Sequence, residues 1–126
     1  MPFYYNKGNP METRFVYITV ADMHEAKKIG RILLEKRLAA CVNLLDAMQS
    51  MYWWEGTIEE SREAVLIAKT TRRLVSPLIE AVKESHSYEC PCIVSLPVEG
   101  GNPAFLKWIS DETGTPSTLE EPGSHT

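Results

Sequence analysis

Apolar and polar residues alternate with two different periods along the first forty residues. Residues 15–20 alternate aromatic and β-branched side chains without a charge, which is typical of a buried strand. From Asp22 onward, apolar residues recur at i, i+3, i+4 and i+7, and Asp22 and Glu25 have the spacing of a capping box. This pattern predicts an amphipathic helix whose last turn carries Lys36 and Arg37, as the helix dipole prefers.

Residues 41–54 and 57–70 predict the two arms of a long β-hairpin. The turn is expected at Glu55-Gly56, because a glycine adopts the positive φ of a tight turn. Each arm is much longer than a usual strand of roughly five or six residues, so one small domain does not cover the whole hairpin. The tip is also apolar and aromatic, which is a hazard for a bare edge in water: it carries Met48, Met51, Tyr52, Trp53 and Trp54. We therefore predict that the base of the hairpin belongs to the monomer and that its tip contacts a partner chain.

The second half of the chain again shows segments with the helical spacing of apolar residues and a segment with the composition of a strand. Apolar residues at helical spacing predict a second helix over 71–85, whose start is open between Arg72 and Ser76-Pro77. Residues 92–98 have the composition of a fourth strand. Asn102-Pro103 is a typical start for a third, short helix.

The order strand, helix, strand, strand, helix, strand predicts an α+β fold of the ferredoxin-like type. In this βαββαβ plait an antiparallel sheet is backed by two helices; here it has a long central hairpin and a short C-terminal helix. The chain length allows one domain, which we expect over 14–114. Residues 1–13 are predicted to be a flexible extension, and 115–126 a disordered tail rich in Thr, Pro, Ser and Glu.

Composition narrows the class of partner and the compartment. A net charge of −4 with 24% charged and 44% hydrophobic residues argues against a nucleic-acid partner, which requires a basic surface. No transmembrane run and no signal peptide is recognisable, so we expect a cytoplasmic protein without a membrane partner. The three cysteines are an odd number, and Cys90 and Cys92 flank a proline too closely for an easy mutual disulfide. Reduced thiols are expected.

Five sequence blocks together resemble one protein family. They are LAACVNL at 38–44, YWWEG at 52–56, LIAKTT at 66–71, HSYECP at 86–91 and FLKWI at 105–109. In order and spacing they are similar to the CutA family, the CutA1 divalent-cation-tolerance proteins, from about Phe15 to Asp111. The resemblance implies a tight homotrimer related in architecture to the PII signalling proteins, with hairpins that pair across subunits. It also implies tolerance of copper and other divalent cations, no organic cofactor and no catalysed reaction, so we do not expect an enzyme.

The same resemblance implies a Cu(II) site at Cys41 and His86. The position of a further family cysteine falls at about Thr19 in this chain. Thiolate and imidazole suit copper or zinc, but two ligands are an incomplete shell for either metal. Cys90 and Cys92 add two possible soft ligands at places where the family has an apolar residue and a glutamate. The alternative is that Cys41 is a small buried hydrophobe, that Cys92 packs beside Ile93 and that His86 caps or leaves the second helix.

A second candidate site is a small-molecule cleft between subunits. Trp54 and Tyr88 are expected to line it, with Lys69 and Glu89 as its polar groups. The alternative is that the aromatic residues are anchors of the trimer interface, where Trp and Tyr are enriched. A separate hypothesis is that Lys69, Arg72 and Arg73 hold an anion near a helix N-terminus, and its alternative is that they form a solvated basic face.

The sequence therefore predicts a ligand-binding trimer associated with divalent cations. Two other functions stay open. One is a small hydrolase in which His86 activates Cys41, which needs the two side chains within hydrogen-bond reach. The other is a structural or signalling trimer whose partner is another protein.

Overall fold

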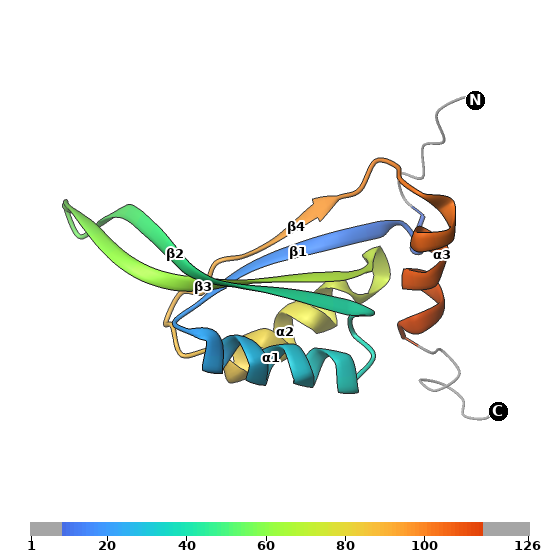
Figure 1. Cartoon of the computed structure of the whole chain (residues 1–126), viewed down its shortest axis with the longest axis horizontal. Coiled ribbons are helices and arrows are strands. Elements are labelled where there is room, and N and C mark those ends of the chain that lie inside the picture. Colours follow the sequence, from blue (N-terminus) through green and yellow to red (C-terminus); the bar gives the residue numbers. More distant parts are fainter. Residues whose placement is uncertain (1–8, 115–126) are drawn as a thin grey trace.

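A computed structural model describes residues 9–114, so the predicted tail and most of the predicted N-terminal extension lie outside the described residues. Four antiparallel strands form one sheet in the order β2-β3-β1-β4 (Figure 1). The helices and strands, in chain order, are β1 (Thr13–Val20), α1 (Met23–Glu35), β2 (Cys41–Trp54), β3 (Thr57–Thr71), a 3-10 turn (Arg72–Leu74), α2 (Val75–Ser85), β4 (Ile93–Pro97) and α3 (Pro103–Glu112). This is the ferredoxin-like plait that the sequence predicts.

The first helix begins as predicted and ends earlier. Asp22 accepts a hydrogen bond from the backbone N–H of Glu25 at 2.9 Å, which is the N-cap of α1. The prediction that Lys36 and Arg37 form its last turn is wrong, because the helix ends at Glu35. Arg37 adopts a positive φ of 57°, and the N–H of Leu38 then donates to the carbonyl of Leu33 at 2.9 Å. This Schellman-type ending turns the chain toward β2.

The second helix and the last two elements differ from prediction only at their ends. A 3-10 turn precedes α2, so Pro77 lies in the first helical turn, where no intrahelical N–H is required of it. The strand predicted over 92–98 is shorter by one residue at each end. Asn102 caps α3 by accepting from the N–H of Ala104 at 3.1 Å, which confirms the predicted start.

One face of the sheet forms the core against α1 and α2. Val16, Ile18 and Val20 of β1 point to this face and are fully buried. Their partners on β3 are Ala68, Leu66 and Ala64, which are also fully buried. Figure 1 shows both helices beneath the sheet, with α3 placed across its far end.

The opposite face of the sheet has no helix over it among the described residues (Figure 1). Strand alternation places Phe15, Tyr17 and Thr19 on this face. Large apolar side chains on it remain exposed: Leu45 is 52%, Val94 45% and Leu96 49% exposed. We call this surface the open face.

The hairpin arms of β2 and β3 are 14 and 15 residues long and project beyond the helices (Figure 1). Glu55 and Gly56 both have positive φ, 48° and 88°, as a type I′ turn requires, so the predicted turn is confirmed. Near the root of the hairpin the register shifts between Leu45 and Met48, which is a β-bulge with one extra residue on β2. Ala47 in the bulge has a φ of 61°. The bulge redirects the outer hairpin relative to the sheet.

Candidate functional site at the root of the hairpin

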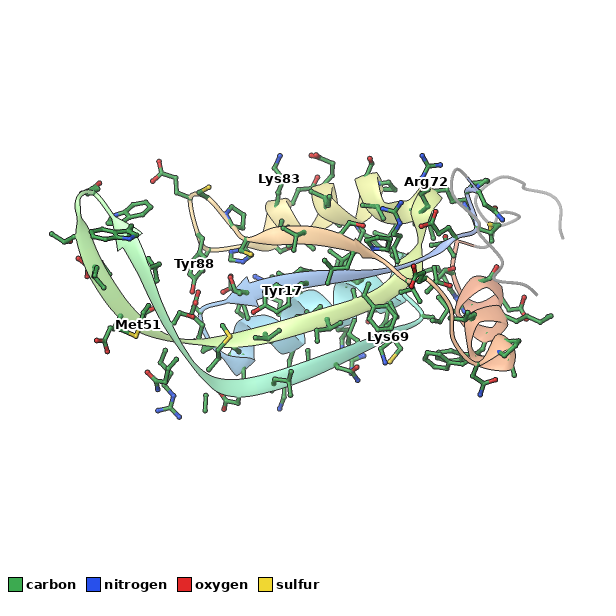
Figure 2. The ribbon with its side chains drawn as sticks, turned by 90° about the horizontal axis from the view of Figure 1, so that it is seen from above. Tyr17, Met51, Lys69, Arg72, Lys83 and Tyr88 are labelled. Atoms are coloured by element: carbon green, nitrogen blue, oxygen red, sulfur yellow. The ribbon has the colours of Figure 1, made fainter. Side chains whose placement is uncertain are left out.

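Tyr88 links the loop after α2 to the root of the hairpin (Figure 2). Its hydroxyl donates to Glu63 Oε2 at 2.8 Å, and the Ser50 hydroxyl donates to Glu63 Oε1 at 2.5 Å. Burial raises the pKa of the Tyr88 phenol, and the hydrogen bond to Glu63 and the charge of that carboxylate raise it further. Tyr88 is therefore a neutral donor that holds a carboxylate from β3.

His86 anchors the same loop to the end of β1. Its side chain is fully buried, and Nε2 lies 2.7 Å from the carbonyl oxygen of Thr19. The backbone N–H of Tyr88 donates to Nδ1 at 3.0 Å. With Nδ1 as the acceptor of this bond, Nε2 is the ring nitrogen that donates to the Thr19 carbonyl. His86 is also the C-cap residue of α2, as one of the sequence alternatives held.

A second carboxylate, Glu25 on α1, completes the anchoring of the loop. It accepts hydrogen bonds from the N–H of Ser87 at 2.6 Å, the Ser87 hydroxyl at 3.0 Å and the N–H of Ala21 at 2.9 Å. Burial alone would raise the pKa of Glu25, but the hydrogen bonds from Ala21 and Ser87 outweigh it, and the pKa is lowered below 4.5. Glu25 is therefore an ionised hub between α1 and the loop.

The structure does not bring Cys41 and His86 together within one chain. Cys41 pairs with Lys69 of β3, and Lys69 pairs with Phe15 of β1. His86 instead contacts Thr19, four residues further along β1, which is about 13 Å at the rise of an extended strand. Cys41 is half-buried, whereas Cys90 and Cys92 are exposed. All three cysteines are free thiols.

The four predicted cleft residues are also spread over the molecule. Tyr88 and Glu89 lie in the loop at the root of the hairpin. Trp54 lies at its tip, 52% exposed. Trp54 pairs with Thr57, and Lys69 lies twelve residues further along β3, roughly 40 Å at the rise of an extended strand. The Nζ atom of Lys69 lies 5.4 Å from the centre of the Phe15 ring and 5.3 Å from the centre of the Phe105 ring (Figure 2).

Sequence reasoning missed the two carboxylates that organise this site. Glu25 was recognised only as part of a helix cap, and Glu63 carried no signal beyond being a polar residue in a strand. Their roles depend on contacts across 62 and 25 positions of the chain, which spacing does not reveal. Among residues 9–114, no group of three or more His, Cys, Asp or Glu side chains is arranged to hold a metal ion.

Two carboxylates and a tyrosine hydroxyl therefore lie where the loop after α2 meets α1 and the root of the hairpin. Both carboxylates are held by donors from the protein, which fixes their position.

None of the helices within the described part of the chain is long and apolar enough to span a bilayer.

Comparison with known proteins agrees with the fold and the sequence blocks. The family model of the CutA1 divalent ion tolerance protein matches residues 14–112. The "Divalent-cation tolerance protein CutA" of Archaeoglobus fulgidus is 46% identical over 99 residues, which cover 79% of this chain and 95% of that protein. The "Protein CutA 1, chloroplastic" of rice is 39% identical over 98 residues; the match covers 78% of this chain and only 55% of the rice protein, about half its length.

Solved structures agree as well. Rice CutA1 superimposes with a TM-score of 0.80 at 36% identity, covering 82% of this chain and 95% of that one. The Thermus thermophilus divalent cation tolerance protein gives 0.79 at 41% identity, covering 81% of this chain and 99% of that one. The chain belongs to the CutA1 divalent ion tolerance protein family.

Proposed function

We propose that this chain forms a homotrimer that contributes to divalent-cation tolerance, and that it binds a cation or a small ligand at the clefts between subunits. The observation that carries the proposal is the open face, continued by the aromatic hairpin. Val94 and Leu96 are exposed on the sheet. On the hairpin, Met51 is 68% exposed and Trp53 is 72% exposed (Figure 2). Apolar surface of this extent is a hazard for a lone chain and typical of an interface.

A closed ring of identical copies is the simplest way to cover this surface. In a cyclic assembly each copy presents its open face to its neighbours, so no apolar edge is left for further addition. The family resemblance favours three copies. The names of the relatives, which refer to divalent-cation tolerance, support the cation part of the proposal.

Charge at the hairpin tip tests the proposed interface. Trp54→Glu should produce smaller species in light scattering, because an unpaired carboxylate would be buried between subunits. Lys83→Glu is the control: Lys83 lies on α2, on the helix side of the sheet, and its side chain is 55% exposed (Figure 2). Unchanged particle size for both variants would refute the placement of the hairpin in the interface.

Cys41 and His86 remain our proposed copper ligands. Because they lie apart in one chain, a site that uses both takes Cys41 from one copy and His86 from another. Both nitrogens of His86 are engaged, so a metal must displace the N–H of Tyr88 from Nδ1 or the Nε2 proton from Thr19. We therefore expect weak binding that weakens further on acidification, because protons compete for imidazole and thiolate.

Calorimetric titration of the assembled protein with Cu(II) tests these ligands. His86→Ala should abolish binding, whereas Thr19→Cys should tighten it by supplying a third ligand. Replacing Cys90 and Cys92 with serine is the control and should leave binding unchanged. Copper binding by His86→Ala that equals the parent would refute the assignment.

For a small ligand, Tyr88 and Glu89 are the residues that we propose at the cleft. Tyr88 donates to Glu63 at the hairpin root, and Glu89 follows Tyr88 in the chain. Contact with Trp54 or Lys69 as well requires those residues from neighbouring copies, since within one chain Trp54 lies at the hairpin tip and Lys69 near the other end of β3. The four residues thus form one cleft only in an assembly.

We propose a binding role and not an enzymatic one. A hydrolase that uses Cys41 as nucleophile needs His86 within hydrogen-bond reach, and one chain separates them by about 13 Å along β1. The relatives are named for tolerance and not for a reaction. A signalling trimer with a protein partner stays the second candidate, favoured by the exposed aromatic tip.

We propose the cytoplasm as the compartment. Three free cysteines, two of them exposed, persist as thiols in a reducing environment. Relatives occupy more than one compartment by their names, since the rice protein is called chloroplastic and the Archaeoglobus fulgidus structure periplasmic. Cell fractionation with an antibody against the chain would test the assignment.

A further inference from the structure

Two exposed thiols, Cys90 and Cys92, lie one residue apart in the loop between α2 and β4. One residue of β1 holds this loop at both of its ends. The carbonyl oxygen of Thr19 lies 2.7 Å from Nε2 of His86, and the N–H of Thr19 donates to the carbonyl of Cys92 at 3.2 Å. Residues 87–91 therefore form a short arch whose two ends are fixed on the same residue.

The arch is also held along its length. Ser87 donates to Glu25 of α1, and the Tyr88 hydroxyl donates to Glu63 of β3 (Figure 2). Pro91 fixes its own φ near about −65° and disfavours helical conformations for the residue before it, which is Cys90. The backbone that carries the two thiols thus has little freedom, so a ligand that joins them loses little conformational entropy on binding.

The spacing of the two thiols suits a bridging ion better than a disulfide. The Cα atoms of residues two apart lie at most about 7 Å from each other. A disulfide needs the sulfur atoms in direct bonding contact at about 2 Å and a specific dihedral angle, and the restricted backbone at Pro91 opposes that arrangement. A metal ion about 2.3 Å from each sulfur allows a sulfur–sulfur distance about twice as long. Both cysteines are free thiols in the structure.

The other metal-binding groups around the arch are already engaged. Both ring nitrogens of His86 have partners, and Glu25 and Glu63 accept hydrogen bonds from the protein. Zinc takes four protein ligands in structural sites, and the described part of the chain brings no third His, Cys, Asp or Glu to this pair. Thiolates are soft ligands that select Cu(I), and two of them satisfy a monovalent ion of this kind.

We propose that Cys90 and Cys92 together bind one soft monovalent cation, Cu(I) or its analogue Ag(I), in a two-coordinate site within a single chain. The site is separate from the proposed Cu(II) ligands, because it uses neither Cys41 nor His86 and takes a different oxidation state. The metal replaces the protons of the thiols, so the affinity falls on acidification. Cu(I) is also the form of copper favoured under the reducing conditions in which exposed cysteines persist as thiols.

Competition with the chromophoric Cu(I) chelator bicinchoninate tests the site on the full chain, with ascorbate as reductant and without oxygen. The parent should bind one Cu(I) per chain. Cys90→Ser and Cys92→Ser should each lower the affinity at least about tenfold, since loss of even an outer-shell partner has that effect on a metal site. Cys41→Ser is the matched control: it removes the third thiol and should retain the affinity of the parent. Parent affinity in either single variant of the pair, or loss of binding in Cys41→Ser, would overturn the proposal.

Two further results would also overturn the proposal. One Cu(I) per two chains in the parent would place the ion between thiols of different copies. Displacement of Cu(I) by an equal concentration of Zn(II) would show that the site prefers a divalent ion. We expect one Cu(I) per chain and no displacement by zinc. Failure here leaves the proposed Cu(II) ligands standing, because calorimetry on His86→Ala tests those ligands separately.

Discussion

At the scale of single residues, the hairpin root depends on carboxylates whose partners are distant in sequence. Glu63 holds Tyr88 and Ser50, and Glu25 holds the loop that begins at His86. Family blocks identified His86 and Tyr88 as site residues, but nothing in the local sequence distinguishes Glu63 from Glu59 or Glu60 on the same strand. The partners of a side chain become visible only when the fold brings the loop and the strand together.

The lowered pKa of Glu25 predicts a pH dependence of stability. The unfolded chain takes up the proton at about the ordinary value of 4.5, whereas the folded protein takes it up at a lower pH. The stabilisation from Glu25 is therefore complete above pH 4.5 and is lost as the pH falls through the folded pKa. Urea unfolding at a series of pH values should show this loss in the parent. In Glu25→Gln the free energy of unfolding should change less steeply with pH on the acid side.

The control for this prediction is Glu84→Gln, since Glu84 is an exposed glutamate on α2. It should retain the acid-side slope of the parent. An equal slope for the parent and Glu25→Gln would contradict the role of Glu25 as an ionised hub.

At the scale of elements, the pattern of apolar residues predicted every helix and strand, and missed how they end. The alternation over β1 and the spacing over α1 follow from which face is buried, so periodicity detects them. The ending of α1 depends on Arg37 taking a left-handed conformation, and the bulge depends on Ala47 doing the same. Neither residue type favours that conformation, so these positions carry no sequence signal.

Gly114, two residues after the end of α3, has a position that should not tolerate a side chain. Its φ is 48°, and a Cβ would lie 2.8 Å from Leu74 Cδ1 and 2.7 Å from Arg73 Nη2. We expect Gly114→Ala to destabilise the protein by about 1 to 3 kcal/mol, through backbone strain and overpacking combined. Chemical denaturation measures the change in the free energy of unfolding.

Gly56→Ala is the matched control for the backbone part of this effect. Gly56 also has a positive φ, 88°, but no atom lies within 4 Å of the position of an added Cβ. Gly56→Ala should therefore lower the free energy of unfolding by less than Gly114→Ala does. A larger loss at Gly56 would contradict the contact between the end of α3 and Leu74.

At the scale of the whole molecule, the hairpin and the open face of the sheet both carry apolar side chains that one chain leaves uncovered. Sequence length alone indicated that a hairpin of this size extends beyond one small domain, and the projecting arms of β2 and β3 confirm it. The apolar residues of the open face were not predicted as a surface, because Val94 and Leu96 read equally well as core positions of a buried strand. Only the absence of a helix from that side of the described fold identifies them as uncovered.

The native mass of the unmodified chain tests the central claim most directly. Sedimentation equilibrium over a range of concentrations should give three times the 14.2 kDa of one chain, without dissociation to a folded monomer, because the open face and the hairpin are buried between copies. A particle of 14.2 kDa that keeps its fold at every concentration would contradict the account.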